Sequence, residues 1–170
     1  MLAVAQSERL RAAWSVLALV PDPEVPVVSV CELGMVRDVL EQDGSLEVVL
    51  TPTYSGCPAT ELICADVKTA LEEAKLGPVK VRLQRSPAWT TDWISDATKQ
   101  KLRDYGIAPP SCLSQEKPIR LVPRRTNPSI ECPRCTSTQT ERLAQHGSTA
   151  CKALYRCLSC KEPFEYFKPI

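Results

Sequence analysis

Apolar and polar positions alternate with helical periodicity near the start of the chain. Apolar side chains recur every three or four residues from Leu10 to Val20, which predicts an amphipathic helix over residues 6–20. Proline lacks the amide donor that a helix interior needs, so this helix is expected to stop at Pro21. A proline-rich loop over residues 21–26 then leads to the next element.

The next segments show the pattern of strands. Two apolar runs, residues 35–42 and 46–51, flank the dipeptide Asp43-Gly44. An Asp-Gly pair between strand-like runs favours a tight hairpin, because both central positions of such a turn need a positive φ. The pattern therefore predicts two antiparallel strands joined by a two-residue turn.

A second helix, a third strand and a third helix are expected after this hairpin. Pro58 suits the first position of a helix, and an apolar stripe continues from there until Gly77. Apolar residues alternate with charged ones over residues 79–83, as in a half-buried strand. A third helix is predicted over residues 94–105 and closes at Gly106. The predicted order is α-β-β-α-β-α.

The periodic patterns end after residue 106, where a proline-rich segment begins. Five of the 23 residues from 107 to 129 are proline, which is typical of an extended linker. We expect an α+β protein in which residues 1–106 form a small α/β domain, residues 107–130 are a linker, and residues 131–170 form a cysteine-containing module. The chain of 170 residues is 44% hydrophobic and 24% charged, as in ordinary globular proteins.

Charge separates an acidic part of the chain from a basic one. Residues 1–116 carry 11 Lys and Arg against 16 Asp and Glu, whereas residues 117–170 carry 10 against 4. A basic tail fits an acidic partner, nucleic acid or simple solvation. The aromatic residues of the tail are expected to form a core and not a stacking platform, so nucleic-acid binding is the weaker interpretation.

The apolar run that follows Arg9 and Arg11 raises the question of a signal peptide. No small-residue cleavage site follows this run, and the run is too short to span a bilayer. We therefore expect a cytoplasmic protein without a membrane segment.

Four of the nine cysteines form two Cys-x-x-Cys pairs near the end of the chain. The pairs, 21 residues apart, are Cys132 with Cys135 and Cys157 with Cys160. Two such pairs provide a closed tetrahedral thiolate set, which predicts a structural zinc ion that contributes folding energy to a small module. Mononuclear iron, a cysteine-ligated iron–sulfur cluster and two unrelated cysteine pairs are the alternatives. Cys151 is expected to be a packed thiol, and His146 a solvated side chain.

Cys57 is the candidate functional residue of the first domain. We expect it at the N-cap of the second helix, where unpaired amides and the helix dipole favour a thiolate that binds soft metal or attacks an electrophile. The acidic loop that contains Asp22 and Glu24 could supply oxygen ligands or a base. A thiol without chemistry is the alternative. The other cysteines before the tail lack this setting: Cys31, Cys64 and Cys112.

Three segments of the first domain resemble the SufT-like iron–sulfur-assembly domain family. They are residues 22–26 (Asp-Pro-Glu-Val-Pro), 32–36 (Glu-Leu-Gly-Met-Val) and 51–58 (Thr-Pro-Thr-Tyr-Ser-Gly-Cys-Pro). The resemblance implies that Cys57 is a reactive cysteine and that the Asp-Pro-Glu loop is a hallmark of the family.

Further segments resemble the PaaD family, also called PaaJ, whose members belong to bacterial phenylacetyl-CoA 1,2-epoxidase systems. These segments are residues 87–93, 106–110 and 147–157, together with the order of the domains and the four-cysteine tail. Two positions depart from the family pattern. Cys31 stands where Thr or Asp is usual, and Pro169 stands where a cysteine is expected, which speaks against a metal role for the extreme C-terminus.

The PaaD resemblance implies an accessory role in phenylacetate catabolism. Such a protein would help to assemble an iron or iron–sulfur centre in the oxygenase or reductase subunit, with Cys57 passing the metal and a zinc ribbon serving as a docking element. The alternative is a stoichiometric docking subunit that moves no metal.

Catalysis by this chain is not expected. The chain lacks the carboxylate and histidine clusters of a di-iron centre and a Gly-x-Gly-x-x-Gly nucleotide loop. A thiol enzyme built on Cys57 would lack a histidine nearby in the sequence. The sequence leaves monomer and dimer open.

Overall fold

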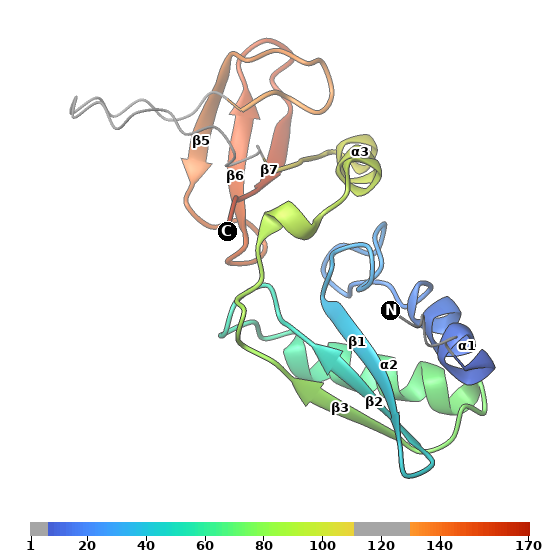
Figure 1. Ribbon diagram of the computed structural model, residues 1–170. Helices are drawn as coiled ribbons and strands as arrows, with labels where there is room; N and C mark the ends of the chain where they lie inside the picture. Colours follow the sequence, from blue (N-terminus) through green and yellow to red (C-terminus); the bar gives the residue numbers. More distant parts are fainter. Residues whose placement is uncertain (1–6, 111–129) are drawn as a thin grey trace, which may run out of the picture. The chain divides into compact units, whose positions relative to one another are not determined.

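The computed structural model describes residues 7–110 and 130–170, and its contacts divide the chain into two compact units, Met1–Trp89 and Thr90–Ile170. The elements of the first unit, in chain order, are α1 (Glu8–Leu17), β1 (Val36–Gln42), β2 (Ser45–Leu50), α2 (Thr60–Glu73) and β3 (Val79–Leu83) (Figure 1). The elements of the second are the 3-10 helix η1 (Thr91–Trp93), α3 (Asp96–Tyr105), β4 (Ile107–Ala108), β5 (Thr140–Ala144), β6 (Lys152–Cys157) and β7 (Pro163–Phe167).

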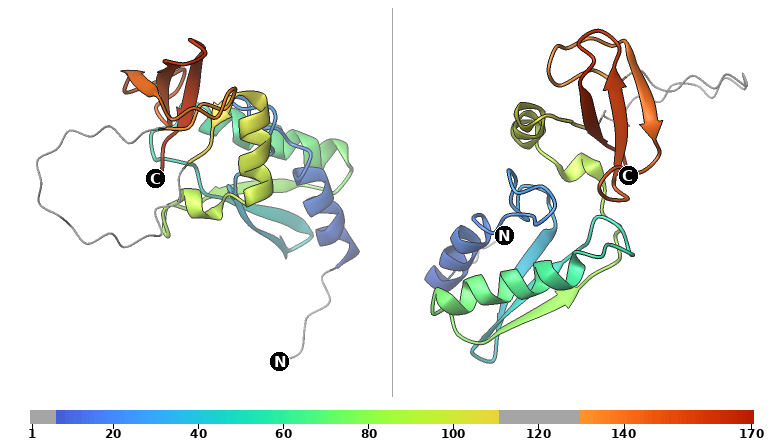
Figure 2. Two further views of the ribbon diagram at one scale, coloured as in Figure 1. Left: turned by 90° about the horizontal axis from the view of Figure 1, so that it is seen from above. Right: turned by 180° about the vertical axis from the view of Figure 1, so that it is seen from behind.

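The first unit is a three-stranded sheet with helices on one face. Strands β1 and β2 form an antiparallel hairpin, and β3 pairs with β2 in parallel after the crossover through α2, which gives the order β1-β2-β3. Both helices lie on the same face of this sheet (Figure 2). The centre of the unit is formed by side chains without solvent exposure: Ala13, Leu17, Leu46, Val48, Val67 and Leu71.

The predicted hairpin turn is confirmed. Gln42 pairs with Ser45, and the two residues between them have positive φ values, 48° at Asp43 and 76° at Gly44. This conformation matches the right-handed twist of the two strands.

The first helix is shorter than predicted. Ser7 caps it by accepting the N–H of Leu10 at 3.2 Å, and the helix ends at Leu17, before Pro21 can terminate it. The N–H groups of Leu19 and Val20 bond three residues back, to Val16 and Leu17. The chain therefore leaves the helix through a tighter final turn.

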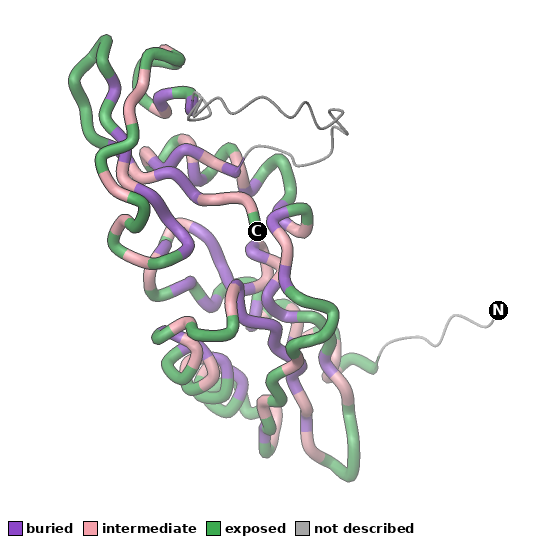
Figure 3. The backbone as a smooth tube through the Cα atoms, turned by 90° about the vertical axis from the view of Figure 1, so that its left-hand side faces the viewer, coloured by how far each residue is buried: buried purple, intermediate pink, exposed green. Residues whose placement is uncertain are grey.

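The second unit is a four-stranded sheet in the order β4-β7-β6-β5, accompanied by α3. The aromatic residues expected to pack are buried: Tyr155, Phe164, Tyr166 and Phe167. The ring of Tyr155 stacks on that of Phe164 at 5.9 Å and meets that of Tyr166 edge-on at 5.7 Å. Figure 3 shows buried positions recurring along the strands and helices, with exposed turns between them. This alternation is expected of elements that have one buried face.

The boundary between the units differs from the one expected at residue 106. Helix α3 belongs to the second unit, and β4, which falls within the expected linker, pairs with β7. Arg103 on α3 forms an ion pair with Glu131 at 3.1 Å, and the N–H of Thr91 donates to the carbonyl of Ile170 at 3.2 Å. These contacts join η1 and α3 to the cysteine module. The rest of the expected linker, 111–129, lies outside the described residues.

None of the helices within residues 7–110 and 130–170 has the length and apolar character that a membrane span requires.

Candidate functional site

The second unit brings the four cysteines of the two pairs together. The sulfur atoms of Cys132, Cys135, Cys157 and Cys160 all lie within 4.8 Å of one another. The distance between Sγ atoms is 3.8 Å from Cys132 to Cys160 and 3.5 Å from Cys135 to Cys157. Zinc–sulfur bonds of about 2.3 Å in a tetrahedron imply sulfur–sulfur distances of about 3.8 Å. The four thiols therefore fit a tetrahedral zinc ion.

The two cysteine pairs share two backbone features. In each pair the first cysteine donates its N–H to a carbonyl five residues later: Cys132 to Ser137 at 2.9 Å and Cys157 to Glu162 at 3.0 Å. The residue after each second cysteine has a positive φ, 60° at Thr136 and 67° at Lys161. Each tight turn therefore points two sulfurs in one direction, and the sequence spacing alone predicted this.

Backbone amides favour the thiolate form at the second pair. The N–H of Cys160 lies 3.5 Å from Sγ of Cys157 and, together with the amide of Ser159, lowers the pKa of Cys157 to about 6 against the opposing effect of burial. Metal ligation requires deprotonated sulfur. The turn thus prepares one ligand before the metal binds.

The other two candidate ligands of this module stay outside the cluster. Cys151 is buried and its sulfur lies 3.0 Å from the hydroxyl of Thr149, while His146 is exposed. Both positions agree with the expectation of a packed thiol and a solvated imidazole.

Cys57 lies on the loop between β2 and α2, and its side chain is half-buried. Its N–H donates to the carbonyl of Tyr54 at 3.2 Å. Its carbonyl accepts the N–H of Thr60 at 3.2 Å and the hydroxyl of Thr60 at 2.8 Å. The backbone of Cys57 is therefore fixed on both sides of the thiol.

The predicted start of α2 is wrong by two residues. The N-cap is Ala59, without a side-chain capping bond, and the helix begins at Thr60, so Cys57 is not the N-cap and Pro58 does not occupy the first helical position. The reason is the bond from Thr60 to the Cys57 carbonyl, which closes a separate turn before the helix.

The acidic loop is folded around its own aspartate. Oδ1 of Asp22 accepts the N–H of Glu24 and the N–H of Val25, both at 2.9 Å, and the Asp22 side chain is buried. Glu24 is half-buried. Asp22 therefore shapes the loop, a role that its position beside proline did not reveal.

Cys57, Asp22 and Glu24 do not form a ligand cluster in this structure. Among the described residues, the four tail cysteines are the one set of three or more Cys, His, Asp or Glu whose ligand atoms all come close enough to hold a metal. Any metal at Cys57 would therefore need ligands from a partner or from a rearranged loop.

The remaining cysteines of the first unit have environments that favour the neutral thiol. Burial, with the adjacent Glu32 charge, raises the pKa of Cys31 to about 11. Burial and the Glu61 charge also raise the pKa of Cys64, which lies inside α2 as expected. Cys112 lies outside the described residues.

One buried polar residue at the start of the Cys57 loop was not predicted. Thr51 is 1% exposed, and its hydroxyl has no hydrogen-bond partner among the residues that the structure describes. A threonine at a strand end carries no sequence signal that distinguishes it from an ordinary β-branched strand residue.

Both units match families of known proteins. The family model described as iron-sulfur cluster assembly protein matches residues 10–83. The family model described as PaaD zinc beta ribbon domain matches residues 116–168. The order of the two matches along the chain is the order expected from the sequence.

Individual proteins extend this similarity. The chain is 44% identical over 169 residues to an Escherichia coli (strain K12) protein named provisionally as the D subunit of 1,2-phenylacetyl-CoA epoxidase, a match that covers 99% of this chain and 98% of that protein. It is 35% identical over 85 residues to the Fe-S protein maturation auxiliary factor YitW of Bacillus subtilis (strain 168), covering 49% of this chain and 82% of YitW. The crystal structure of a domain of unknown function, DUF59, from Bacillus anthracis aligns with a TM-score of 0.53 at 28% identity, covering 59% of this chain and 97% of that one.

Proposed function

Because this chain belongs to the PaaD family of phenylacetyl-CoA epoxidase subunits, we propose that it is an accessory protein that helps to assemble an iron or iron–sulfur centre in the oxygenase or reductase of that system. The observation that carries the proposal is the half-buried Cys57 thiol on a fixed loop within the part matched by the iron–sulfur-assembly family. A thiolate is a ligand of iron and of iron–sulfur clusters.

The proposed sequence of events uses Cys57 as a temporary ligand. Its thiolate would bind iron or a cluster delivered as cargo, and thiolate or imidazole ligands of the client would then replace it. Asp22 assists by shaping the acidic loop through its two amide contacts, and Glu24 offers a carboxylate oxygen. No catalytic step on an organic substrate is assigned to this chain.

The second unit is proposed to hold zinc in a structural role, as its ligand geometry allows. Cys132, Cys135, Cys157 and Cys160 are the ligands in this proposal. Four thiolates leave no open position for a substrate, so the ion would stabilise the fold and perform no chemistry. The described cysteines outside this set are free thiols, which fits the proposed cytoplasmic location.

A stoichiometric docking subunit is the second candidate function. It is favoured by the name of the E. coli relative, which describes one component of a complex. In that case the protein would stay with the oxygenase at a fixed ratio, and Cys57 would be dispensable.

The two candidates are separated by client maturation with Cys57→Ala protein under anaerobic conditions. We expect the variant to keep its fold and its zinc, and to yield oxygenase or reductase that lacks its metal centre. Cys64→Ala is the matched control, because Cys64 is also half-buried but lies within α2 and is expected to support normal maturation. If the client matured with Cys57→Ala protein is active and carries its full metal centre, the proposal of metal transfer is wrong and the docking subunit remains as the function.

A further inference from the structure

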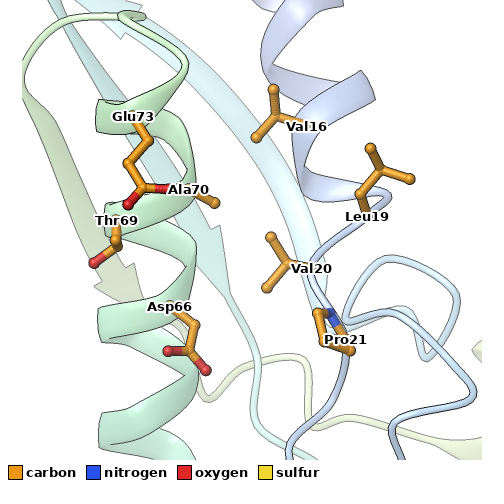
Figure 4. Close-up of a pocket in the computed structure, with 8 residues that line it drawn as sticks. All are labelled: Val16, Leu19, Val20, Pro21, Asp66, Thr69, Ala70 and Glu73. Atoms are coloured by element: carbon orange, nitrogen blue, oxygen red, sulfur yellow. The ribbon is translucent and has the colours of Figure 1, made fainter.

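The first unit has a groove whose lining includes neither Cys57 nor any of the four tail cysteines. It lies between the C-terminal end of α1 and the C-terminal half of α2 and has a volume of about 430 Å³. Val16 and Val20 line it from the α1 side and Ala70 from the α2 side (Figure 4). This volume falls within the range of small-molecule pockets.

Leu19 forms an apolar rim of this groove. Leu19 is 82% exposed, although its backbone is held by the bond from its N–H to the carbonyl of Val16 at 3.0 Å. The core of the unit gains little from a leucine in this position. A singly exposed leucine is common on protein surfaces, so Leu19 matters here because it continues the apolar lining formed by Val16, Val20 and Ala70.

The α2 side of the groove is acidic. Asp66 and Glu73 are separated by seven residues, so they lie on one face of the helix about 10.5 Å apart along its axis. Within the described part of the chain neither carboxylate forms an ion pair, whereas the nearby Lys68 pairs with Glu72 at 3.9 Å. None of the described residues that line the groove is Lys or Arg. The groove therefore combines an apolar floor with two carboxylates whose charge its described lining does not neutralise.

We infer that this groove is a docking site for a segment of a partner protein that carries an aliphatic side chain flanked by Lys or Arg. The aliphatic side chain would cover Val16, Val20 and Ala70, and the cations would lie beside Asp66 and Glu73. An acidic or uncharged segment would desolvate the carboxylates without compensation, so charge complementarity selects a basic one. The identity of the partner as an oxygenase or reductase subunit rests on the proposed function. The chemistry inferred for the docking segment does not depend on that function.

Site-specific photo-cross-linking with the full-length, zinc-loaded protein tests this inference. p-Benzoylphenylalanine is placed at position 19, the protein is mixed with purified oxygenase and reductase components, and cross-linked peptides are sequenced. The matched control places the same group at position 62, because Leu62 is an exposed leucine of α2 that does not line the groove. We expect cross-linking from position 19 only, into a segment that contains an aliphatic residue flanked by Lys or Arg.

Charge variants provide the second measurement. The double variant Asp66→Asn, Glu73→Gln is expected to lower the yield from position 19 about fivefold, the effect of losing about 1 kcal/mol of rim ion pairing. Glu72→Gln, outside the groove, is expected to leave the yield unchanged. Equal yields from positions 19 and 62, no cross-link from 19, or a cross-linked segment without cations overturns the docking inference.

This outcome is independent of the test of Cys57. If cross-linking fails while maturation still depends on Cys57, the docking inference is wrong and the proposal of metal transfer stands. If cross-linking succeeds while Cys57→Ala protein still matures the client fully, the docking inference stands and the proposal of metal transfer is wrong.

Discussion

Lys152 and Glu165 form an ion pair across the β6–β7 hairpin, with 2.8 Å between Nζ and Oε2. The side chain of Lys152 is 3% exposed and that of Glu165 is 23% exposed. Glu165 also accepts the N–H of Ser148 at 2.7 Å. Burial alone would raise the pKa of Glu165, but Lys152 and Ser148 outweigh burial and lower the pKa overall. One carboxylate thus neutralises a buried ammonium and holds the loop before β6.

Removing the carboxylate should cost more than removing the ammonium. Glu165→Ala is expected to lower the free energy of unfolding of the second unit by about 3–5 kcal/mol, because Lys152 would keep a buried charge without a partner. Lys152→Met is expected to cost about 1–2 kcal/mol, since Glu165 is partly solvated and keeps its bond to Ser148. Denaturant unfolding of the zinc-loaded protein measures both values.

An exposed ion pair on the same sheet is the control for this comparison. Arg156 and Glu141 interact across β5 and β6 with side chains 50% and 41% exposed. Glu141→Ala should therefore cost less than about 1 kcal/mol. Similar losses for Glu165→Ala and Glu141→Ala would contradict the importance of burial at Lys152.

Removal of zinc should unfold the second unit and spare the first. Purified protein is expected to contain one zinc ion, and a chelator in the presence of reductant should abolish amide protection in β5–β7 while protection in β1–β3 persists, because the binding free energy of a structural zinc is folding free energy. Hydrogen exchange with mass spectrometry measures both units in one sample.

Two cysteine variants test the ligand assignment. Cys157→Ala removes a buried ligand and is expected to abolish zinc binding. Cys151→Ala removes a thiol that is also buried but lies outside the cluster, and it should retain the zinc, at a cost in stability of about 1 kcal/mol for lost packing. Zinc loss from both variants would show that the ligand set is wrong.

The features predicted from the sequence were those that local chemistry determines. The turn at Asp43-Gly44 follows from its need for positive φ, and the four-thiol cluster follows from the spacing within two cysteine pairs. In both cases a few adjacent residues restrict the backbone enough to decide its conformation. The buried aromatic residues of β6 and β7 were likewise evident from their apolar character.

The features that were missed depend on partners distant in the sequence. Residues Thr140–Ala144 carry no regular apolar alternation, and they form β5 because β6 pairs with them. β4 is two residues long and exists through its pairing with β7. Tertiary contacts override local propensity in each case.

Asp22 should be required for the stability of its loop. Asp22→Ala is expected to lower the free energy of unfolding by about 2 kcal/mol, because the N–H groups of Glu24 and Val25 would lose a charged acceptor. Asp22→Asn retains an oxygen acceptor and should cost less. If Asp22→Ala instead leaves stability intact and weakens iron binding in an anaerobic titration, Asp22 acts as a metal ligand and does not organise the loop.

Alkaline pH should reveal the environment of Cys31. The folded protein holds the Cys31 proton until about pH 11, whereas the unfolded chain releases it from its ordinary value of 9.0. The unfolded state therefore binds fewer protons between these values, and stability falls as the pH rises through them. The full difference between the two pKa values corresponds to a loss of about 2.7 kcal/mol in the free energy of unfolding. Because solvent screens a half-buried group, we expect a loss of about 1 kcal/mol.

The contribution of Cys31 can be isolated because serine does not titrate in this range. Urea unfolding of wild-type and Cys31→Ser protein is compared at pH 8, where both states keep the proton, and at steps up to about pH 11. All other titrating groups are common to both proteins, so their effects cancel in the difference. The wild type should lose stability relative to the variant above pH 9. Parallel curves would mean that water reaches the Cys31 sulfur and that burial does not hold its proton.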